Sequence, residues 1–115
     1  MLDAHVLAQV HARAFNGHDV GLWMQQAMPD ARVLRDGELL GQGPDAMRDG
    51  IEAEYRTQEL VHARVIDLDG EPALAEFAGD EHNAVVRGLI RFKAYAGRLS
   101  EVDIDHSPEA RQRVM

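Results

Sequence analysis

The sequence predicts an α+β domain in which helices come first and antiparallel strands come last. Residues 84–95 are rich in β-branched and aromatic side chains, the chain turns at residues 96–98, and residues 99–105 return as a second strand. The first half of the chain instead places apolar residues at helical spacing. This order predicts a curved sheet packed against three helices of the N-terminal half, an arrangement that can enclose a pocket.

Three helices are expected before the sheet. Residues 2–16 carry an apolar stripe at helical spacing. Asp19 is a good N-cap for a second helix at residues 20–28. Pro44 suits the first turn of a third helix, at residues 44–56.

The strands are separated by turn signals such as Asp36-Gly37 and Asp69-Gly70. The expected strands span residues 31–35, 38–41, 59–67, 72–77, 84–95 and 99–105. The tail from Ser107 is expected to be frayed or helical for one turn. No repeat or linker divides the chain, so one domain spanning residues 1–115 is predicted.

Composition excludes several classes of function. The sequence has no cysteine, which excludes a disulfide framework and a thiolate nucleophile and fits a cytoplasmic location. The formal net charge of −8 and the scattered arginines argue against nucleic acid or an anionic membrane as partner. No apolar run is long enough for a membrane span, and the amphipathic N-terminus does not predict a signal peptide. The histidine spacing predicts no metal site, and the turn at residues 41–44 lacks the ending of a phosphate loop, so no cofactor is predicted.

Turn and packing motifs follow one another along nearly the whole chain: FNGHD at 15–19, PDARV at 29–33, GQG at 41–43, DGEPA at 69–73, RF at 91–92 and GRLSEV at 97–102. By these motifs the chain resembles the nuclear transport factor 2-like superfamily, in the branch of SnoaL-like polyketide cyclases and ketosteroid isomerases. The resemblance implies a cystatin-like α+β roll, with a cone-shaped sheet, a pocket between sheet and helices, and a homodimer through the outer face of the sheet.

Alternation of side chains along the strands assigns one apolar set to the cone interior and one charged set to the outer face. The interior set is Val86, Gly88, Ile90 and Phe92, with Val102, Ile104 and His106, and with Ala73, Ala75 and Phe77. The outer set is Arg87, Arg91, Lys93, Glu101, Asp103 and Asp105. A dimer through this outer face would therefore have a polar contact.

The resemblance does not supply the catalytic groups of the known branches. The first-helix tyrosine of ketosteroid isomerases falls near His11, their base at Arg35 or Asp36, and their oxyanion-hole aspartate at Gly88, which has no side chain. The acid of the SnoaL-like cyclases falls near Ile104, which cannot transfer a proton. Steroid isomerisation is therefore not expected.

Three residues are the candidates for proton chemistry. His11 lies on the apolar stripe of the first helix and could act near neutral pH, or it could be a boundary histidine. His106 extends the inward set and could be an acid, a base or a ligand anchor, or it could lie at the surface. Asp36 could be catalytic, although Asp before Gly commonly stabilises a turn. The direction of His62 depends on the strand register.

Further candidates could bind a ligand. Arg35 could bind an anionic group at the cone mouth, or it could be solvated. Trp23 could line the pocket or pack in the core, and Tyr55 could donate its hydroxyl. Val86, Gly88, Ile90, Phe92 and Phe77 complete the expected lining, with Gly88 widening it.

Three functions fit these features. The first is a pocket protein for a small apolar ligand, such as an isomerase, cyclase or dehydratase that uses histidine proton transfer. The second is a non-catalytic ligand-binding or homodimeric interaction module. The third is a structural dimer whose cone is filled by its own side chains, among them Phe15, Trp23, Met24, Met28, Phe77 and Phe92.

Overall fold

The computed structural model of the chain describes residues 4–56, 61–79 and 82–114. The helices are α1 (Ala4–Asn16), α2 (Val20–Gln26), α3 (Pro44–Tyr55) and α4 (Pro108–Val114). The strands are β1 (Ala27–Arg35), β2 (Glu38–Gln42), β3 (Val61–Leu68), β4 (Glu71–Ala78), β5 (Val85–Tyr95) and β6 (Arg98–Asp105). Each described helix is too short or too polar to cross a lipid bilayer.

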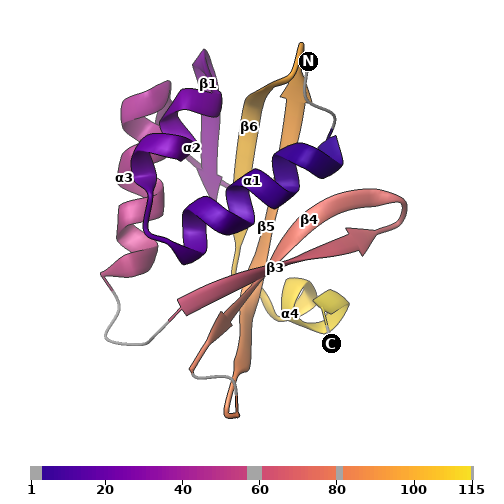
Figure 1. The fold of residues 1–115 in the computed structure, drawn as a ribbon. Coiled ribbons are helices and arrows are strands. Elements are labelled where there is room, and N and C mark those ends of the chain that lie inside the picture. The colour runs from indigo at the N-terminus through magenta and orange to yellow at the C-terminus, as the bar shows by residue number, and fades with distance from the viewer. Residues whose placement is uncertain (1–3, 57–60, 80–81, 115) are drawn as a thin grey trace.

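The six strands form one curved, unclosed sheet in the order β2-β1-β6-β5-β4-β3 (Figure 1). Neighbouring strands run antiparallel except β1 and β6, which pair in parallel. Carboxyl ends of parallel strands meet at the same edge, so Arg35 at the end of β1 lies opposite Ile104 near the end of β6.

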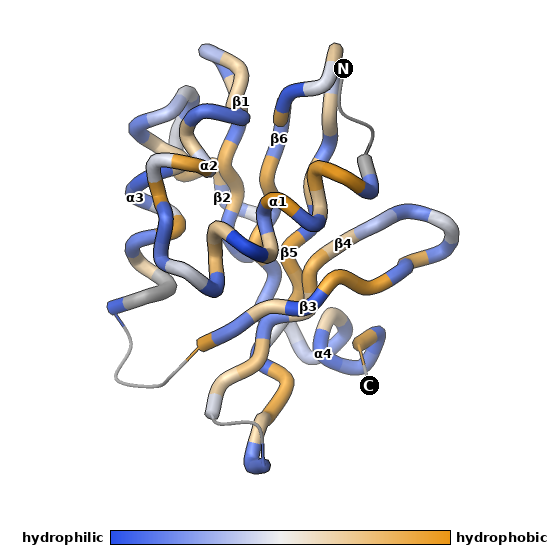
Figure 2. Tube along the Cα trace, viewed as in Figure 1, coloured by the Kyte–Doolittle hydropathy of each residue, from blue (hydrophilic) through white to orange (hydrophobic). Residues whose placement is uncertain are grey.

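Helices cover both faces of the sheet unequally. Helices α1, α2 and α3 cover the face that we call the inner face, and the short α4 packs against β5 on the outer face (Figure 1). Hydrophobic segments of α1 and of the central strands meet where the helix crosses the sheet (Figure 2). The main core lies there, and its largest fully buried side chains include Trp23, Phe15, Met47 and Ile51.

The predicted fold class is confirmed, and most elements lie within a few residues of their expected ranges. Helix α2 is shorter than expected, because the chain already enters β1 at Ala27. The tail forms a helix of 7 residues, and its buried Ala110 packs against Ala73 and Leu89. A second small core on the outer face thus holds this helix in place, where the sequence leaves a frayed tail or a single helical turn as alternatives.

The expected facing of β4 is wrong by one residue. Leu74 belongs to the inner core, whereas Ala73 packs with α4 on the outer face. Phe77 also faces outward, where its ring stacks on His62 at 5.3 Å between centroids. Ala and Gly flank this strand with little contrast between its two faces, so alternation alone did not identify the inner one.

A β-bulge in β5 produces the second correction. Glu76 pairs with Gly88, but the next pair is Phe77 with Val86, so Arg87 is the extra residue. Val86 therefore shares the outer face with Phe77, and Arg87 turns inward, the reverse of the predicted arrangement. The other five residues of the predicted outer set keep that facing, since Arg91 and Lys93 pair with the acids of β6 there.

Asn16 joins α1 to the free edge of the sheet. Its Oδ1 accepts a hydrogen bond from the Ala63 N–H at 2.7 Å, and its Nδ2 donates to the Ala63 carbonyl at 3.0 Å. The side-chain amide thus satisfies both backbone groups of one residue on edge strand β3. This contact sets the end of α1 beside Glu76, which is the β4 partner of Ala63.

Candidate functional site

Three polar side chains meet on the inner face where strands β4, β5 and β6 lie side by side. Nε2 of His106 lies 2.9 Å from Oε1 of Glu76, and Nε of Arg87 lies 3.9 Å from Oε2 of the same carboxylate. Glu76 is fully buried, while the side chains of His106 and Arg87 are 18% and 16% exposed. We call these three residues the Glu76 cluster.

Gly88 makes the contact between Glu76 and His106 possible. Glu76 lies on β4, His106 directly follows β6, and Gly88 lies on the strand between them. A Cβ atom at Gly88 would lie 2.6 Å from Cδ2 of His106 and 2.5 Å from the Asp105 carbonyl oxygen. The imidazole therefore occupies the space that a side chain on β5 would fill. Gly88 was predicted to widen a pocket, but the space beside it is occupied by the His106 ring.

The bulge at Arg87 gives the buried carboxylate a cationic partner. A regular strand would have turned Arg87 outward, because neighbouring residues of a strand face opposite sides. Burying a carboxylate is costly unless it is paired and hydrogen-bonded. Bulges often re-aim a side chain near a functional site, and this one brings Arg87 to Glu76.

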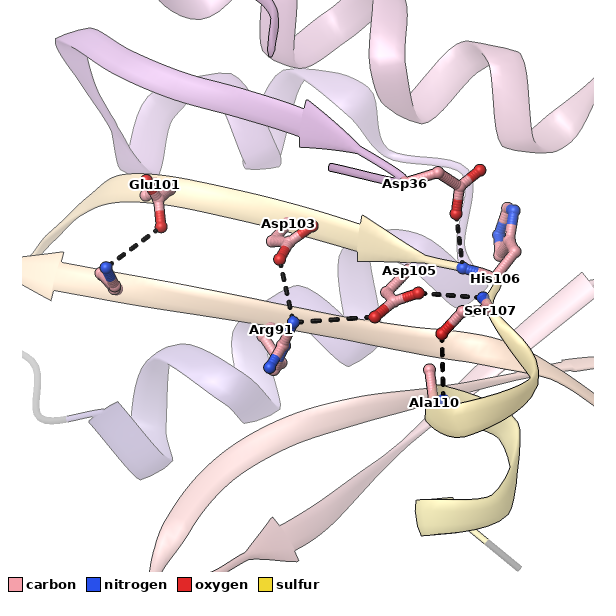
Figure 3. Close-up of polar contacts among 9 residues, drawn as sticks. Asp36, Arg91, Glu101, Asp103, Asp105, His106, Ser107 and Ala110 are labelled. Atoms are coloured by element: carbon pink, nitrogen blue, oxygen red, sulfur yellow. Dashed lines mark hydrogen bonds and ion pairs between the residues drawn. The ribbon is translucent and has the colours of Figure 1, made fainter. Parts of the chain in front are cut away.

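Asp36 contacts the backbone of the same histidine. It opens the β1–β2 turn, where Asp36 and Gly37 both have positive φ, 51° and 85°. Its Oδ1 accepts a hydrogen bond from the His106 N–H at 2.8 Å (Figure 3). Asp36 thus lies in the predicted turn, its carboxylate bonds the backbone of His106 70 residues further along the chain, and the turn lies beside the Glu76 cluster.

His11 lies in a different environment, deeper in the core. Its ring stacks on Trp23 at 4.2 Å between centroids and meets the edge of Phe92 at 5.7 Å. Neither ring nitrogen of His11 has a hydrogen-bond partner among the described residues. Burial lowers the pKa of His11 from 6.5 to about 4. His11 is therefore neutral at physiological pH and a weak base there.

The outer face carries a ladder of ion pairs. Arg91 donates to Oδ2 of Asp103 at 3.0 Å and lies 3.7 Å from Oδ2 of Asp105 (Figure 3). Burial, together with the negative charges of Asp105 and Glu101, raises the pKa of Asp103 despite the charge and the hydrogen bond of Arg91. Burial also acts to raise the pKa of Asp105, but hydrogen bonds from Ser107 and the charge of Arg91 lower it overall. A groove of about 330 Å³ runs along this ladder beside Phe92 and Lys93.

The structure brings some of the predicted site residues together and separates others. His106, Gly88 and Asp36 meet at one end of the sheet, and Arg35 directly precedes Asp36. Trp23, Ile90 and Phe92 lie with His11 in the core, whereas Val86 and Phe77 face outward. The side chain of Tyr55, at the end of α3, lies outside the described part of the chain. Within the described ranges, no three potential metal ligands converge on one point.

Sequence reasoning missed Glu76 and the inward direction of Arg87. A signal for Glu76 was present: it is the one charged residue in the apolar run at residues 72–78. A charged residue inside an otherwise buried strand indicates a partner or a function. The direction of Arg87 had no such signal, because the bulge depends on pairing between strands that sequence alternation does not show.

Solved structures share this arrangement of helices and curved sheet. An uncharacterised cystatin-fold protein from Novosphingobium aromaticivorans is 18% identical with a TM-score of 0.66, over 90% of this chain and 98% of that one. A candidate polyketide cyclase from Sinorhizobium meliloti is 17% identical with a TM-score of 0.66, over 90% and 99% of the two chains. The chain has the nuclear transport factor 2-like fold.

A third structure with this fold is a candidate ketosteroid isomerase from Kribbella flavida, 16% identical with a TM-score of 0.65, over 90% of this chain and 77% of that one. No protein-family model matches the chain, and no curated protein matches it. The resemblance inferred from the turn motifs is thus confirmed for the fold. At these sequence identities, a shared nuclear transport factor 2-like fold does not show that two proteins catalyse the same reaction.

Proposed function

We propose that the protein binds a small, largely apolar molecule on the inner face of its sheet and transfers a proton with His106. The reaction class is that of an isomerase, cyclase or dehydratase. The observation that carries this proposal is the 2.9 Å contact between His106 and the fully buried Glu76 carboxylate. A carboxylate that fixes one nitrogen of an imidazole orients the ring and stabilises its protonated form, which makes histidine an effective general base.

The contact also indicates which nitrogen would act. When Glu76 is ionised, Nε2 of His106 carries the proton of the bond between them. Nδ1 is then the basic nitrogen of the neutral ring. The partial exposure of His106, against the complete burial of His11, supports His106 as the group that a ligand reaches.

The neighbours support a reaction of this class. One is named as a candidate ketosteroid isomerase and another as a candidate polyketide cyclase. Ketosteroid isomerisation is a proton transfer at an apolar site, with a carboxylate as the base. In this chain the proposed base is a histidine that a carboxylate supports.

A non-catalytic role is the second candidate, and the filling of the core favours it. Trp23, Phe15 and His11 are fully buried and occupy the space beneath α1. A cone filled in this way would act as a scaffold for a ligand-binding or dimeric module. A cytoplasmic location is also proposed, on the support of the cysteine-free sequence.

Thermal shifts with a library of small ketones, enols and aromatic compounds test the proposal. A compound that binds the folded state raises the melting temperature. We expect at least one compound to stabilise the native protein and to lose that effect in H106N and E76Q. The control H62N changes a histidine of the outer face and should respond like the native protein. Stabilisation that survives H106N and E76Q, or none at all, would favour the non-catalytic role.

A further inference from the structure

Asp36 lies where the parallel pairing of β1 and β6 ends. Its own N–H donates to the Ile104 carbonyl at 2.8 Å, which continues the ladder between the two strands. β1 ends at Arg35, and the backbone already leaves the strand conformation at Asp36 and Gly37, whose φ angles are positive. The next N–H on this side belongs to His106, the residue after the end of β6, and the Asp36 carboxylate accepts its hydrogen bond at 2.8 Å. The side chain thus extends the ladder by one residue.

The backbone after His106 is fixed by a second set of contacts. Oδ1 of Asp105 accepts the Ser107 N–H at 2.9 Å, and Oγ of Ser107 accepts the Ala110 N–H at 3.2 Å (Figure 3). From the end of β1, the neighbouring strand, Asp36 supplies a further contact by accepting the His106 N–H. His106 therefore leaves the sheet from a backbone that hydrogen bonds restrain on both sides.

We propose that Asp36 is a positioning residue for His106. The contact between His106 and Glu76 reaches across β5 at Gly88. The His106 ring packs so closely on Gly88 that a Cβ atom there would lie 2.6 Å from Cδ2 of the ring. A small shift of the His106 backbone would move the ring into β5 or away from Glu76. Asp36 acts on the backbone N–H rather than on the ring, so an oxygen acceptor is what the position requires. A negative charge is not required.

Three substitutions at Asp36 separate the acceptor from the turn. D36N keeps an oxygen acceptor, and Asn tolerates positive φ. D36G keeps the turn conformation but removes the acceptor. D36A removes the acceptor and disfavours the turn. The comparison of D36N with D36G therefore isolates the hydrogen bond to His106.

Two nuclear magnetic resonance readouts in the protein without ligand report the effect. The His106 amide should exchange with solvent within about threefold of native in D36N and about 10- to 100-fold faster in D36G. The ¹⁵N shifts of the His106 ring should keep the Nε2-protonated tautomer in native protein and D36N and show a mixture in D36G. Melting curves of all variants serve as the control for global stability.

Unchanged exchange and tautomer in D36G would overturn the proposal, and so would D36N behaving like D36G. An unprotected His106 amide in the native protein would overturn it without any variant. The importance of Asp36 for turnover rests on the proposed function of His106, but these readouts do not. If H106N turns over substrate like the native protein while the Asp36 variants behave as expected, the function of His106 is rejected. The positioning role of Asp36 then still stands.

Discussion

His11 and His106 both lie on the inner side of the sheet, but their surroundings differ. His11 is enclosed by aromatic rings that offer no hydrogen bond, so burial favours its neutral form in the folded core. His106 bonds to a carboxylate and keeps contact with solvent. Their positions on apolar stripes made the two look alike in the sequence. Their roles follow from neighbours that come from other elements.

The burial of His11 predicts a pH-dependent stability. Its pKa is about 4 in the folded protein against 6.5 in the unfolded chain, so the unfolded chain binds more protons between these values. The contribution of His11 to the free energy of unfolding is therefore fully present above pH 6.5. It falls by about 3 kcal/mol as the pH drops to 4. Urea unfolding across this range measures the effect.

Replacing His11 tests whether it causes that dependence. H11L removes the titrating group and two buried nitrogens without partners, so its stability at neutral pH should stay within about 1 kcal/mol of native. The fall in unfolding free energy from pH 6.5 to pH 4 should become smaller by the contribution of His11. H5Q changes an exposed histidine of the same helix and should keep the native slope. An unchanged slope in H11L would show that other groups cause the decline.

Gly88 gives a second test at the scale of one residue. In G88A the new methyl group would overlap the Asp105 carbonyl and the His106 ring, so unfolding free energy should fall by about 1–3 kcal/mol. The Nε2–H resonance of His106 should lose its hydrogen-bonded shift at the same time.

The matched control for G88A is G21A in helix α2. Gly21 is exposed, and a Cβ there would meet only Asp19 Oδ1, at 3.6 Å. Alanine is a better helix former than glycine, so G21A should raise stability by about 0.5–1 kcal/mol. A G88A protein as stable as native, with His106 unchanged, would mean that Gly88 is not needed for the contact.

At the scale of elements, the sequence predicted which segments are helix or strand better than which way their side chains face. Periodicity identifies an element because it repeats over many residues, as in α1 and β6. Facing depends on a single residue of register, and β4 has buried residues on both faces. The bulge at Arg87 needs the partner strand to be known. The candidate site was therefore only partly predictable: His106 and Asp36 were among the predicted candidates, and Glu76 was not.

The link between α1 and β3 belongs to this scale. N16A removes both hydrogen bonds to Ala63 and should lower unfolding free energy by about 1–2 kcal/mol. N16D keeps the acceptor and loses the donor, so it should fall between N16A and native. Q9A, on the exposed side of the same helix, should change stability by less than about 0.5 kcal/mol. Equal stabilities of N16A and Q9A, by urea unfolding, would contradict the link.

At the scale of the whole molecule, the fold positions the site but does not name a ligand. The curved sheet brings Asp36 and Glu76 to His106, although they lie 70 and 30 positions before it in the chain. Ligand identity depends on the space around them, which no motif in the sequence encodes. This is why the fold could be inferred from turn motifs while the substrate could not.

The homodimer expected through the outer face remains a proposal with its own test. The ladder around Arg91 makes that face charged, so a dimer there should be held by polar contacts. Salt screens exposed ion pairs, and we expect the dimer to dissociate more readily at high salt. Light scattering after size-exclusion chromatography at low and high salt measures this. A monomer at both salt concentrations would contradict the proposal.

Proton transfer by His106 can be measured as deuterium uptake at the α-carbon of a small ketone that stabilises the protein, in heavy water. We expect the native protein and H62N to exchange that position at the same rate. H106N should be slower by at least about 100-fold, the usual contribution of a general base, and E76Q should also be slower because it loses the carboxylate that supports this base. Exchange by H106N at the native rate would contradict the assignment of the Glu76 cluster as the functional site.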